Sequence, residues 1–409
     1  MNNSLARFLT ASLLLILCNV MAGALTNENL LTDNDSVQRP DTLKLLCVGN
    51  SYTSDEMSYL PYVLEQLCPE MHVRIGHLIS GSASVSEWWV QRNSAKIIGT
   101  PVYSSGPRHR YNPEGGFLWT GTRYVEWTSS SRTWSNALID SVSLTQALTT
   151  ESWDYVTFQQ VSELVRDYSS ISTPLSNLTN YVREKLPGVK IGWIFTHVWN
   201  DRYSAENNIG DSDTLWGIAI DVVRQIVDSN LVDFVIPNGT AIQNLRHTQA
   251  KSLGEYYSTE YPYPGLSADG SHLHEGLGCL GASMCAAAVF TNRHPNVLIE
   301  YDESWNVYGT NFTDKDNPVP IGMTPELENT AYRCAWAAVQ SPYEITDISN
   351  IPGDVDGSGI VDVDDVNAVI NIILGKIQAS DYGDAADVDC SGIVDVDDVN
   401  ATINIILQS

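Results

Sequence analysis

The chain between residues 43 and 236 alternates short apolar runs with longer segments in which apolar residues recur at helical spacing. Short apolar runs bounded by polar or turn residues are typical of buried strands. They lie at 43–48, 73–79, 154–158, 189–196 and 231–236. Helices are predicted in this way at 55–67, 137–148 and 214–228, and the long apolar segment of small residues at 277–290 is also expected to be a helix. The alternation predicts an α/β fold, namely a three-layer α/β/α sandwich around a parallel sheet.

Residues 88–135 interrupt this alternation, because they are rich in Trp, Tyr, Gly, Arg and Ser. We expect them to form a long insertion near one edge of the sheet. Their tryptophans could stack on sugar rings, although a single tryptophan more often packs in the protein interior.

The amino terminus has the three parts of a secretory signal peptide. Arg7 precedes an apolar stretch at 8–20, and the small residues 22–24 follow it. The stretch is too short to span a membrane, and no later segment has the pattern of a membrane span. We therefore expect a signal peptide at 1–24, a flexible lead-in at 25–42, and a secreted protein.

The net charge and the cysteine pattern disfavour two kinds of ligand, namely nucleic acid and zinc. The formal net charge of -27 disfavours binding to the phosphate backbone of nucleic acids. Cys18 leaves with the signal peptide unless it carries a lipid, a use that the bulky Leu17 before it disfavours. The other six cysteines form no CxxC pair, so no zinc site is predicted, and a disulfide between two of them stays open.

Two nearly identical segments, 354–374 and 387–407, start 33 residues apart (387 − 354). Each has oxygen-bearing groups at the spacing of a calcium loop. The first loop has Asp354, Asp356, Ser358, the Ile360 carbonyl, Asp362 and Asp365. The second has Asp387, Asp389, Ser391, the Ile393 carbonyl, Asp395 and Asp398. Two structural calcium ions are expected, and because uncompensated carboxylates repel one another, folding of this region should require them.

A helical pattern follows each loop, and no entering helix precedes it. Such a pair of loop–helix units resembles a type I dockerin module, a small all-α calcium-binding domain that we assign to 346–409. The resemblance implies a cohesin-type domain as partner, recognised through loop positions 10 and 11, which are Val363, Asp364, Val396 and Asp397. The alternatives are a purely intramolecular role and a merely acidic, solvated tail.

Ser51 is the first candidate for chemistry. It follows the predicted strand at 43–48 and Gly49, and a helical segment comes next. Ligands of a parallel α/β sheet gather at the carboxyl ends of the strands, where a serine in a tight turn can project its hydroxyl as a nucleophile. The alternative is that Ser51 is an ordinary helix N-cap.

Asp269 and His272 are the second candidate, three residues apart before the predicted helix at 277–290. In a turn, the Asp269 carboxylate can reach the His272 ring and fix its tautomer, so that the other ring nitrogen can take a proton from a serine. His274 is a weaker candidate, because no carboxylate precedes it by three residues. The alternative is that Asp269 caps the turn and His272 lies on the surface.

The segments G-N-S-Y-T at 49–53 and D-G-S-H-L at 269–273 resemble blocks one and five of the SGNH (GDSL-type) hydrolases. More specifically, the chain resembles a branch of uncharacterised, secreted SGNH-like proteins with a GNS[FY]T opening. The resemblance covers roughly residues 43–300 and implies a flavodoxin-like SGNH hydrolase domain, which we assign to 43–345. It implies Ser51 as nucleophile, with His272 and Asp269 as base and orienter.

The resemblance further implies an oxyanion hole made by the backbone of Ser51, the backbone of Gly81 and an amide side chain of the third block. The asparagine usual in that block is absent, and Gln159 and Gln160 follow the strand at 154–158 instead. Since strand alternation lets only one of them face the site, we favour Gln160 over Gln159. The alternative is that both are ordinary polar residues at a strand end.

These motifs predict an exported serine esterase, a carboxylic ester hydrolase that removes O-acyl groups such as acetyl from a polysaccharide or glycan. The dockerin would dock it to a cohesin-bearing complex, and catalysis would need no cofactor. The alternative is a catalytically degenerate SGNH-fold protein that binds carbohydrate or is held on a scaffold. The missing asparagine favours this alternative, whereas Ser51, Asp269 and His272 oppose it.

Overall fold

The computed structural model describes five stretches of the chain, with short gaps inside the last four, namely 41–94, 122–248, 266–295, 325–348 and 353–408. The chain divides into two compact units, Met1–Gln38 and Arg39–Ser409, and every described residue belongs to the second. The predicted signal peptide and nearly all of the lead-in lie outside the described residues. None of the helices described is long and apolar enough to cross a membrane.

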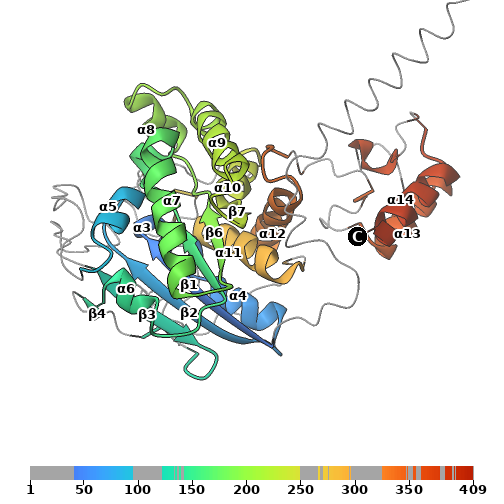
Figure 1. Ribbon diagram of the computed structural model, residues 1–409. Coiled ribbons are helices and arrows are strands. Elements are labelled where there is room, and N and C mark those ends of the chain that lie inside the picture. The colour runs from blue at the N-terminus through green and yellow to red at the C-terminus, as the bar shows by residue number, and fades with distance from the viewer. Residues whose placement is uncertain are drawn as a thin grey trace, which may run out of the picture. The chain divides into compact units, whose positions relative to one another are not determined.

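A seven-stranded sheet in the order β4–β3–β2–β1–β5–β6–β7 forms the centre of the fold (Figure 1). Its five neighbouring parallel strands are β2 (His72–Ile79), β1 (Thr42–Gly49), β5 (Tyr155–Phe158), β6 (Lys190–Ile194) and β7 (Phe234–Ile236). The antiparallel strands β3 (Arg123–Thr128) and β4 (Leu138–Ile139) extend the sheet beyond β2. The predicted α/β fold is therefore confirmed, but the sheet is mostly rather than wholly parallel, because β3 and β4 are antiparallel.

Helices cover both faces of this sheet. Apolar side chains of β1, β5 and β6 form one core with the helices α5 (Val85–Val90), α6 (Leu144–Ala147), α7 (Tyr168–Lys185) and α9 (Ser212–Asp228). The opposite layer contains α3 (Ser51–Met57), α4 (Leu60–Leu67), α10 (Asn238–Arg246), α11 (Leu277–Thr291) and α12 (Pro325–Gln340). The short helices η1 (Ser162–Leu164) and α8 (Asp201–Glu206) lie in connections after β5 and β6. The result is three layers with the carboxyl ends of the parallel strands at one edge.

Two predicted helices differ from the structure. The helix predicted at 137–148 is wrong in its first half, where β4 pairs with β3, and only α6 is helical. The boundary has a local cause, because Ser143 and Gln146 form a capping box that starts a helix at Leu144. The helix predicted at 55–67 is two helices, and the first of them starts earlier, at Ser51.

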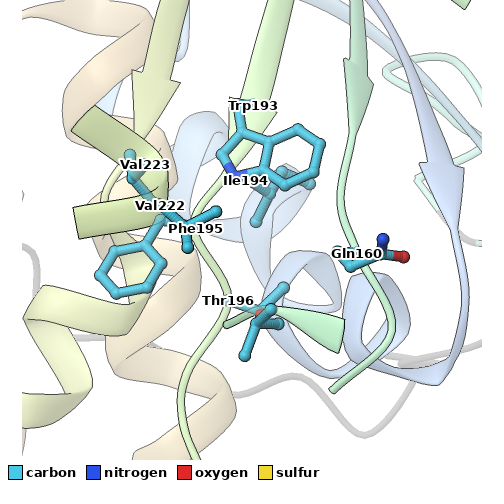
Figure 2. A pocket seen from close by; sticks show the side chains of 8 residues that line it. Gln160, Trp193, Ile194, Phe195, Thr196, Val222 and Val223 are labelled. Atoms are coloured by element: carbon cyan, nitrogen blue, oxygen red, sulfur yellow. The ribbon is translucent and has the colours of Figure 1, made fainter. Parts of the chain in front are cut away.

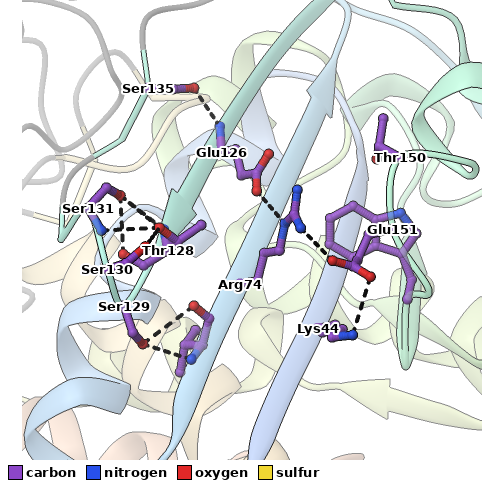
Figure 3. Close-up of polar contacts among 12 residues, drawn as sticks. Lys44, Arg74, Glu126, Thr128, Ser129, Ser130, Ser131, Ser135, Thr150 and Glu151 are labelled. Carbon is purple, nitrogen blue, oxygen red and sulfur yellow. Dashed lines mark hydrogen bonds and ion pairs between the residues drawn. The ribbon is translucent and has the colours of Figure 1, made fainter.

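An ion-pair cluster ties the sheet together near the amino ends of β1 and β2 (Figure 3). Arg74 of β2 pairs with Glu126 of β3 and with Glu151, which precedes β5. Lys44 of β1 also reaches Glu151, at 3.2 Å. This cluster lies at the edge of the sheet opposite Ser51, so it contributes to stability without contacting the candidate site.

The carboxyl-terminal region contains α13 (Val363–Ile373), η5 (Gly383–Ala386) and α14 (Val396–Gln408). A small core of Val355, Val369 and Ala386 joins them, with Ile372 and Val399 packed against it. Val363 and Val396, at the first positions of the two helices, are exposed.

Five cysteines are buried free thiols, namely Cys47, Cys68, Cys279, Cys285 and Cys334. Cys18 and Cys390 lie outside the described residues. No disulfide joins the five thiols that the structure describes.

Candidate active site

Ser51 lies directly after β1, as the first residue of α3. The N-cap of this helix is Asn50, whose Oδ1 accepts a hydrogen bond from the Tyr52 backbone N–H at 3.0 Å. Asn50 Nδ2 donates to the Ala83 carbonyl at 3.1 Å, which anchors the turn to the segment after β2. Because Asn50 caps the helix, the Ser51 hydroxyl is not used for this purpose, and the reading of Ser51 as an N-cap is wrong.

The Ser51 hydroxyl contacts the His272 ring, with Oγ and Nε2 2.9 Å apart. The two side chains come from segments 221 residues apart, and both are half-buried. Asp269, the predicted orienter, lies outside the described residues. His274 is in the interior, where its Nδ1 accepts the Gly276 backbone N–H at 3.2 Å. A serine hydroxyl within hydrogen-bond distance of an imidazole is the arrangement that general-base activation requires.

Gly81 lies beside the turn that carries Ser51. The parallel register pairs Gly49 with Ile79, and the Ser80 backbone N–H donates to the Gly49 carbonyl at 3.0 Å. Two strands therefore deliver Gly81 and Ser51 to neighbouring positions at the same edge of the sheet.

Gln160, which the sequence interpretation favoured, has its amide engaged elsewhere. Its Oε1 accepts the backbone N–H groups of Val85 and Val161 at 3.1 and 2.9 Å, and its Nε2 donates to Ser170 Oγ at 3.3 Å. Figure 2 shows it at a small, mostly apolar pocket whose other labelled lining residues are Trp193, Ile194, Phe195, Thr196, Val222 and Val223. Neither Ser51 nor His272 lines this pocket, so Gln160 holds the α5 connection in place.

Gln159 is the glutamine that lies at the serine turn. A Cβ added to Gly49 would lie 2.7 Å from Gln159 Nε2, so the amide sits against the residue two positions before Ser51. The side chain is 1% exposed, and neither of its amide atoms has a hydrogen-bond partner among the described residues. The geometry thus reverses the preference for Gln160, because strand alternation turns Gln160 toward the α5–α7 side.

Sequence reasoning missed a set of buried polar groups beneath Ser51. Glu56 and His197 form a buried pair, with Oε1 and Nδ1 2.8 Å apart, and Tyr52 stacks on the His197 ring at 4.3 Å between centroids. Asp55 is fully buried as well. The available signal was two adjacent carboxylates, Asp55 and Glu56, in a short helix that follows the nucleophile candidate.

Two thiols near this edge are poor nucleophiles. Burial raises the pKa of the Cys47 thiol to about 12. Burial, assisted by the charge of Glu56, raises the pKa of Cys285 well above its ordinary value. Both thiols are protonated at neutral pH, so neither is an activated nucleophile.

In the described parts of the two candidate calcium loops, the last aspartate of each loop is buried and accepts backbone hydrogen bonds. Asp365 is fully buried and accepts the backbone N–H groups of Val355 and Asp362 at 2.7 and 2.8 Å. Asp354 is 4% exposed, and its Oδ2 accepts from Arg333 at 3.0 Å. In the second loop, Asp398 is fully buried and accepts the Asp395 N–H at 2.7 Å.

The donor set of the first loop is made of oxygen atoms, as calcium prefers, and Asp365 draws both ends of the loop together. The described residues contain no group of three or more His, Cys, Asp or Glu that could hold a metal ion, and Asp354 is paired with Arg333. Other predicted ligands lie outside the described residues, namely Asp356, Ser358, Ile360 and Asp389. Of the remaining second-loop ligands, Asp387 accepts the Ser391 N–H at 2.9 Å, and Ile393 is exposed.

The chain is similar to a domain family of unknown function and to solved structures. The sequence model of DUF4886, a domain of unknown function, matches residues 135–290, a span that includes His272 but not Ser51. A DUF4886 family protein from Bacteroides uniformis is 20% identical with a TM-score of 0.56, over 75% of this chain and 98% of that chain. A proposed SGNH hydrolase from Slackia heliotrinireducens is 16% identical with a TM-score of 0.34, over 61% and 98% of the two chains. No curated protein matches the chain. The chain thus shares its α/β fold with the Bacteroides uniformis protein.

Proposed function

We propose that the protein is a serine esterase of SGNH type, and that Ser51 and His272 carry the reaction. The observation that supports this proposal is the 2.9 Å contact between Ser51 Oγ and His272 Nε2 at the carboxyl edge of the sheet. A contact of this length lets the imidazole remove the hydroxyl proton as the oxygen attacks.

The proposed reaction has two steps. Ser51 Oγ attacks the ester carbonyl carbon, while Nε2 of His272 takes the hydroxyl proton and returns it to the leaving alcohol, which gives an acyl-serine. Water then attacks the acyl-serine with His272 as base, the carboxylic acid leaves and the Ser51 hydroxyl is restored. Asp269 is proposed as the orienter of His272 on the sequence motif alone.

The oxyanion hole is proposed to consist of the Ser51 N–H, the Gly81 N–H and the Gln159 amide. Removing one such donor typically costs on the order of 10² to 10³ in rate. Gln159 suits the role because a buried amide without a partner among the described residues is available to an oxyanion that forms during the reaction.

The substrate class is proposed to be an O-acyl ester, such as acetyl, on a polysaccharide or glycan. The test compares the wild type with Ser51→Ala and His272→Ala on small aryl esters and on acetylated polysaccharides. We expect both variants to lose activity at unchanged melting temperature. Equal hydrolysis by the wild type and Ser51→Ala would overturn the proposal and leave the alternative of a non-catalytic carbohydrate-binding protein.

The carboxyl-terminal region is proposed to be a dockerin at 346–409 that binds two calcium ions and docks an exported enzyme to a cohesin-type domain. Bound calcium would neutralise and crosslink the carboxylates of each loop. The exposure of Val363 and Val396 supports this proposal, because these positions are then accessible to a partner. We expect EDTA to unfold this region, and Asp365→Ala to weaken calcium binding while ester hydrolysis is retained. An unfolding transition that is insensitive to EDTA would contradict the assignment of a dockerin.

A further inference from the structure

The short helix α3 buries two carboxylates directly after Ser51. Asp55 and Glu56 are both 0% exposed. A buried carboxylate costs several kcal/mol in lost hydration unless hydrogen bonds or charges compensate. Asp55 contacts the segment 271–273, which carries His272, directly, and Glu56 contacts it through His197.

Two contacts hold the residues on either side of His272. Asp55 Oδ2 accepts the backbone N–H of Leu273 at 3.0 Å. The Tyr52 and Ser271 hydroxyl groups share a hydrogen bond of 2.7 Å. The residue before the base and the residue after it are therefore both attached to the helix that begins with the nucleophile.

Glu56 reaches the same segment through His197. The Glu56 Oε1 atom accepts the backbone N–H of His197 at 2.8 Å and contacts the ring Nδ1 at 2.8 Å. The ring Nε2 lies 2.7 Å from the Ser271 carbonyl oxygen. Because a carbonyl only accepts, Nε2 carries a proton and donates it there. Asn238 supports the carboxylate by donating to Oε2 at 3.3 Å.

Tyr52 contacts both His197 and the segment that carries His272. Its ring stacks on His197 at 4.3 Å between centroids and meets His272 edge-on at 5.5 Å. One side chain thus contacts the base, the histidine beneath the base and the residue that precedes the base.

We propose that Tyr52, Asp55 and Glu56 are positioning residues for His272, with Glu56 acting through His197. This inference rests on the proposed function, because it concerns how the base is held at Ser51. A displacement of about 1 Å at a reacting pair can cost roughly 10² in rate. Anchoring the base to the helix of the nucleophile fixes their separation across 221 residues of sequence.

The experiment measures kcat and KM for a small aryl acetate with the full chain. Tyr52→Phe keeps the stacked ring and removes only the hydroxyl, and Glu56→Gln removes the carboxylate from His197. We expect kcat to fall about tenfold in the first and up to about a hundredfold in the second, with KM within about twofold of the wild type.

Control variants remove the same types of contact at more exposed positions, where none of the partners is Tyr52, Glu56 or His272. Tyr168→Phe breaks a Tyr–Ser hydroxyl pair of 2.6 Å, and Asp213→Asn breaks a carboxylate–imidazole contact of 2.8 Å with His247. We expect both controls to keep the wild-type kcat. If Glu56→Gln does not fold, Tyr52→Phe alone decides the matter.

The outcomes separate the two proposals. Loss of activity in Ser51→Ala with wild-type kcat in Tyr52→Phe and Glu56→Gln would overturn the positioning role alone. The positioning role would also be overturned if kcat fell equally in the two control variants. Full activity in Ser51→Ala would overturn the esterase proposal and the positioning role together.

Discussion

Gln159 and Gln160 are adjacent and equally buried, yet we expect opposite effects when each is replaced by methionine. The Gln159 amide has no partner among the described residues, whereas the Gln160 amide makes three hydrogen bonds. Methionine has nearly the same shape as glutamine and no amide, so each substitution isolates the contribution of the amide group.

The magnitudes follow from these contacts. Leaving a buried polar group without a hydrogen bond costs about 1–3 kcal/mol. Gln159→Met removes such a group, so the free energy of unfolding should stay the same or rise by up to that amount. Gln160→Met strips the acceptor from the Val85 and Val161 N–H groups, so the free energy of unfolding should fall by about 1–3 kcal/mol.

The catalytic effects should run in the opposite direction. If Gln159 stabilises the oxyanion, Gln159→Met lowers kcat on an aryl acetate by roughly 10² to 10³. Gln160→Met should lower kcat little once the folded fraction is taken into account. The assay combines urea denaturation with steady-state kinetics on the same samples. Wild-type kcat in Gln159→Met, or a large kcat loss at wild-type stability in Gln160→Met, would refute the reasoning.

Three further predictions concern the serine turn, the amino edge and the carboxyl-terminal loops. Gly49→Ala places a Cβ against Thr53 Oγ1 and 2.7 Å from Gln159 Nε2, so both side chains must shift, and kcat should change more than KM, as measured by steady-state kinetics. A backbone hydrogen bond from Ser152, with smaller contributions from Lys44 and Arg74, lowers the pKa of Glu151 from 4.5 to about 2. A lowered pKa stabilises the fold above pH 4.5, and this stability is lost as the pH falls toward 2. Glu151→Gln should therefore make the free energy of unfolding depend less on pH between 4.5 and 2 in an acid-denaturation series. Asp365→Ala should abolish one of two calcium-binding steps in titration calorimetry, and two remaining steps would contradict the loop assignment.

The strands that carry the site were predictable, because buried parallel strands are apolar along their whole length. The insertion was harder to interpret. β3 at Arg123–Thr128 is an antiparallel strand in a segment rich in polar residues, and the short β4 fell within a pattern that favoured a helix. In both cases the structure depends on pairing with another strand, and the local sequence does not contain that strand.

The candidate site was likewise predictable only where local sequence carries the information. The motif around Ser51 and His272 located two residues that the fold brings within 2.9 Å. Alternation beyond β5 predicted that only one of the two glutamines faces the serine turn, but it carries no information on which face of the sheet that is. The contact between Glu56 and His197 spans 141 residues, and neither residue belongs to a motif.

The composition of α3 is hard to explain by stability alone. Six of its seven residues are buried, and they include a tyrosine and two carboxylates as well as Met57. Apolar residues of similar volume often stabilise a protein more than buried ionic groups do. Hydrogen bonds, however, are directional, and a loop that must present an imidazole to a hydroxyl needs fixed orientation more than it needs burial. The polar side of α3 is therefore best explained by the geometry that it imposes on His272. Because burying these polar groups costs free energy, we expect variants that are more apolar at these positions to gain stability and to lose kcat.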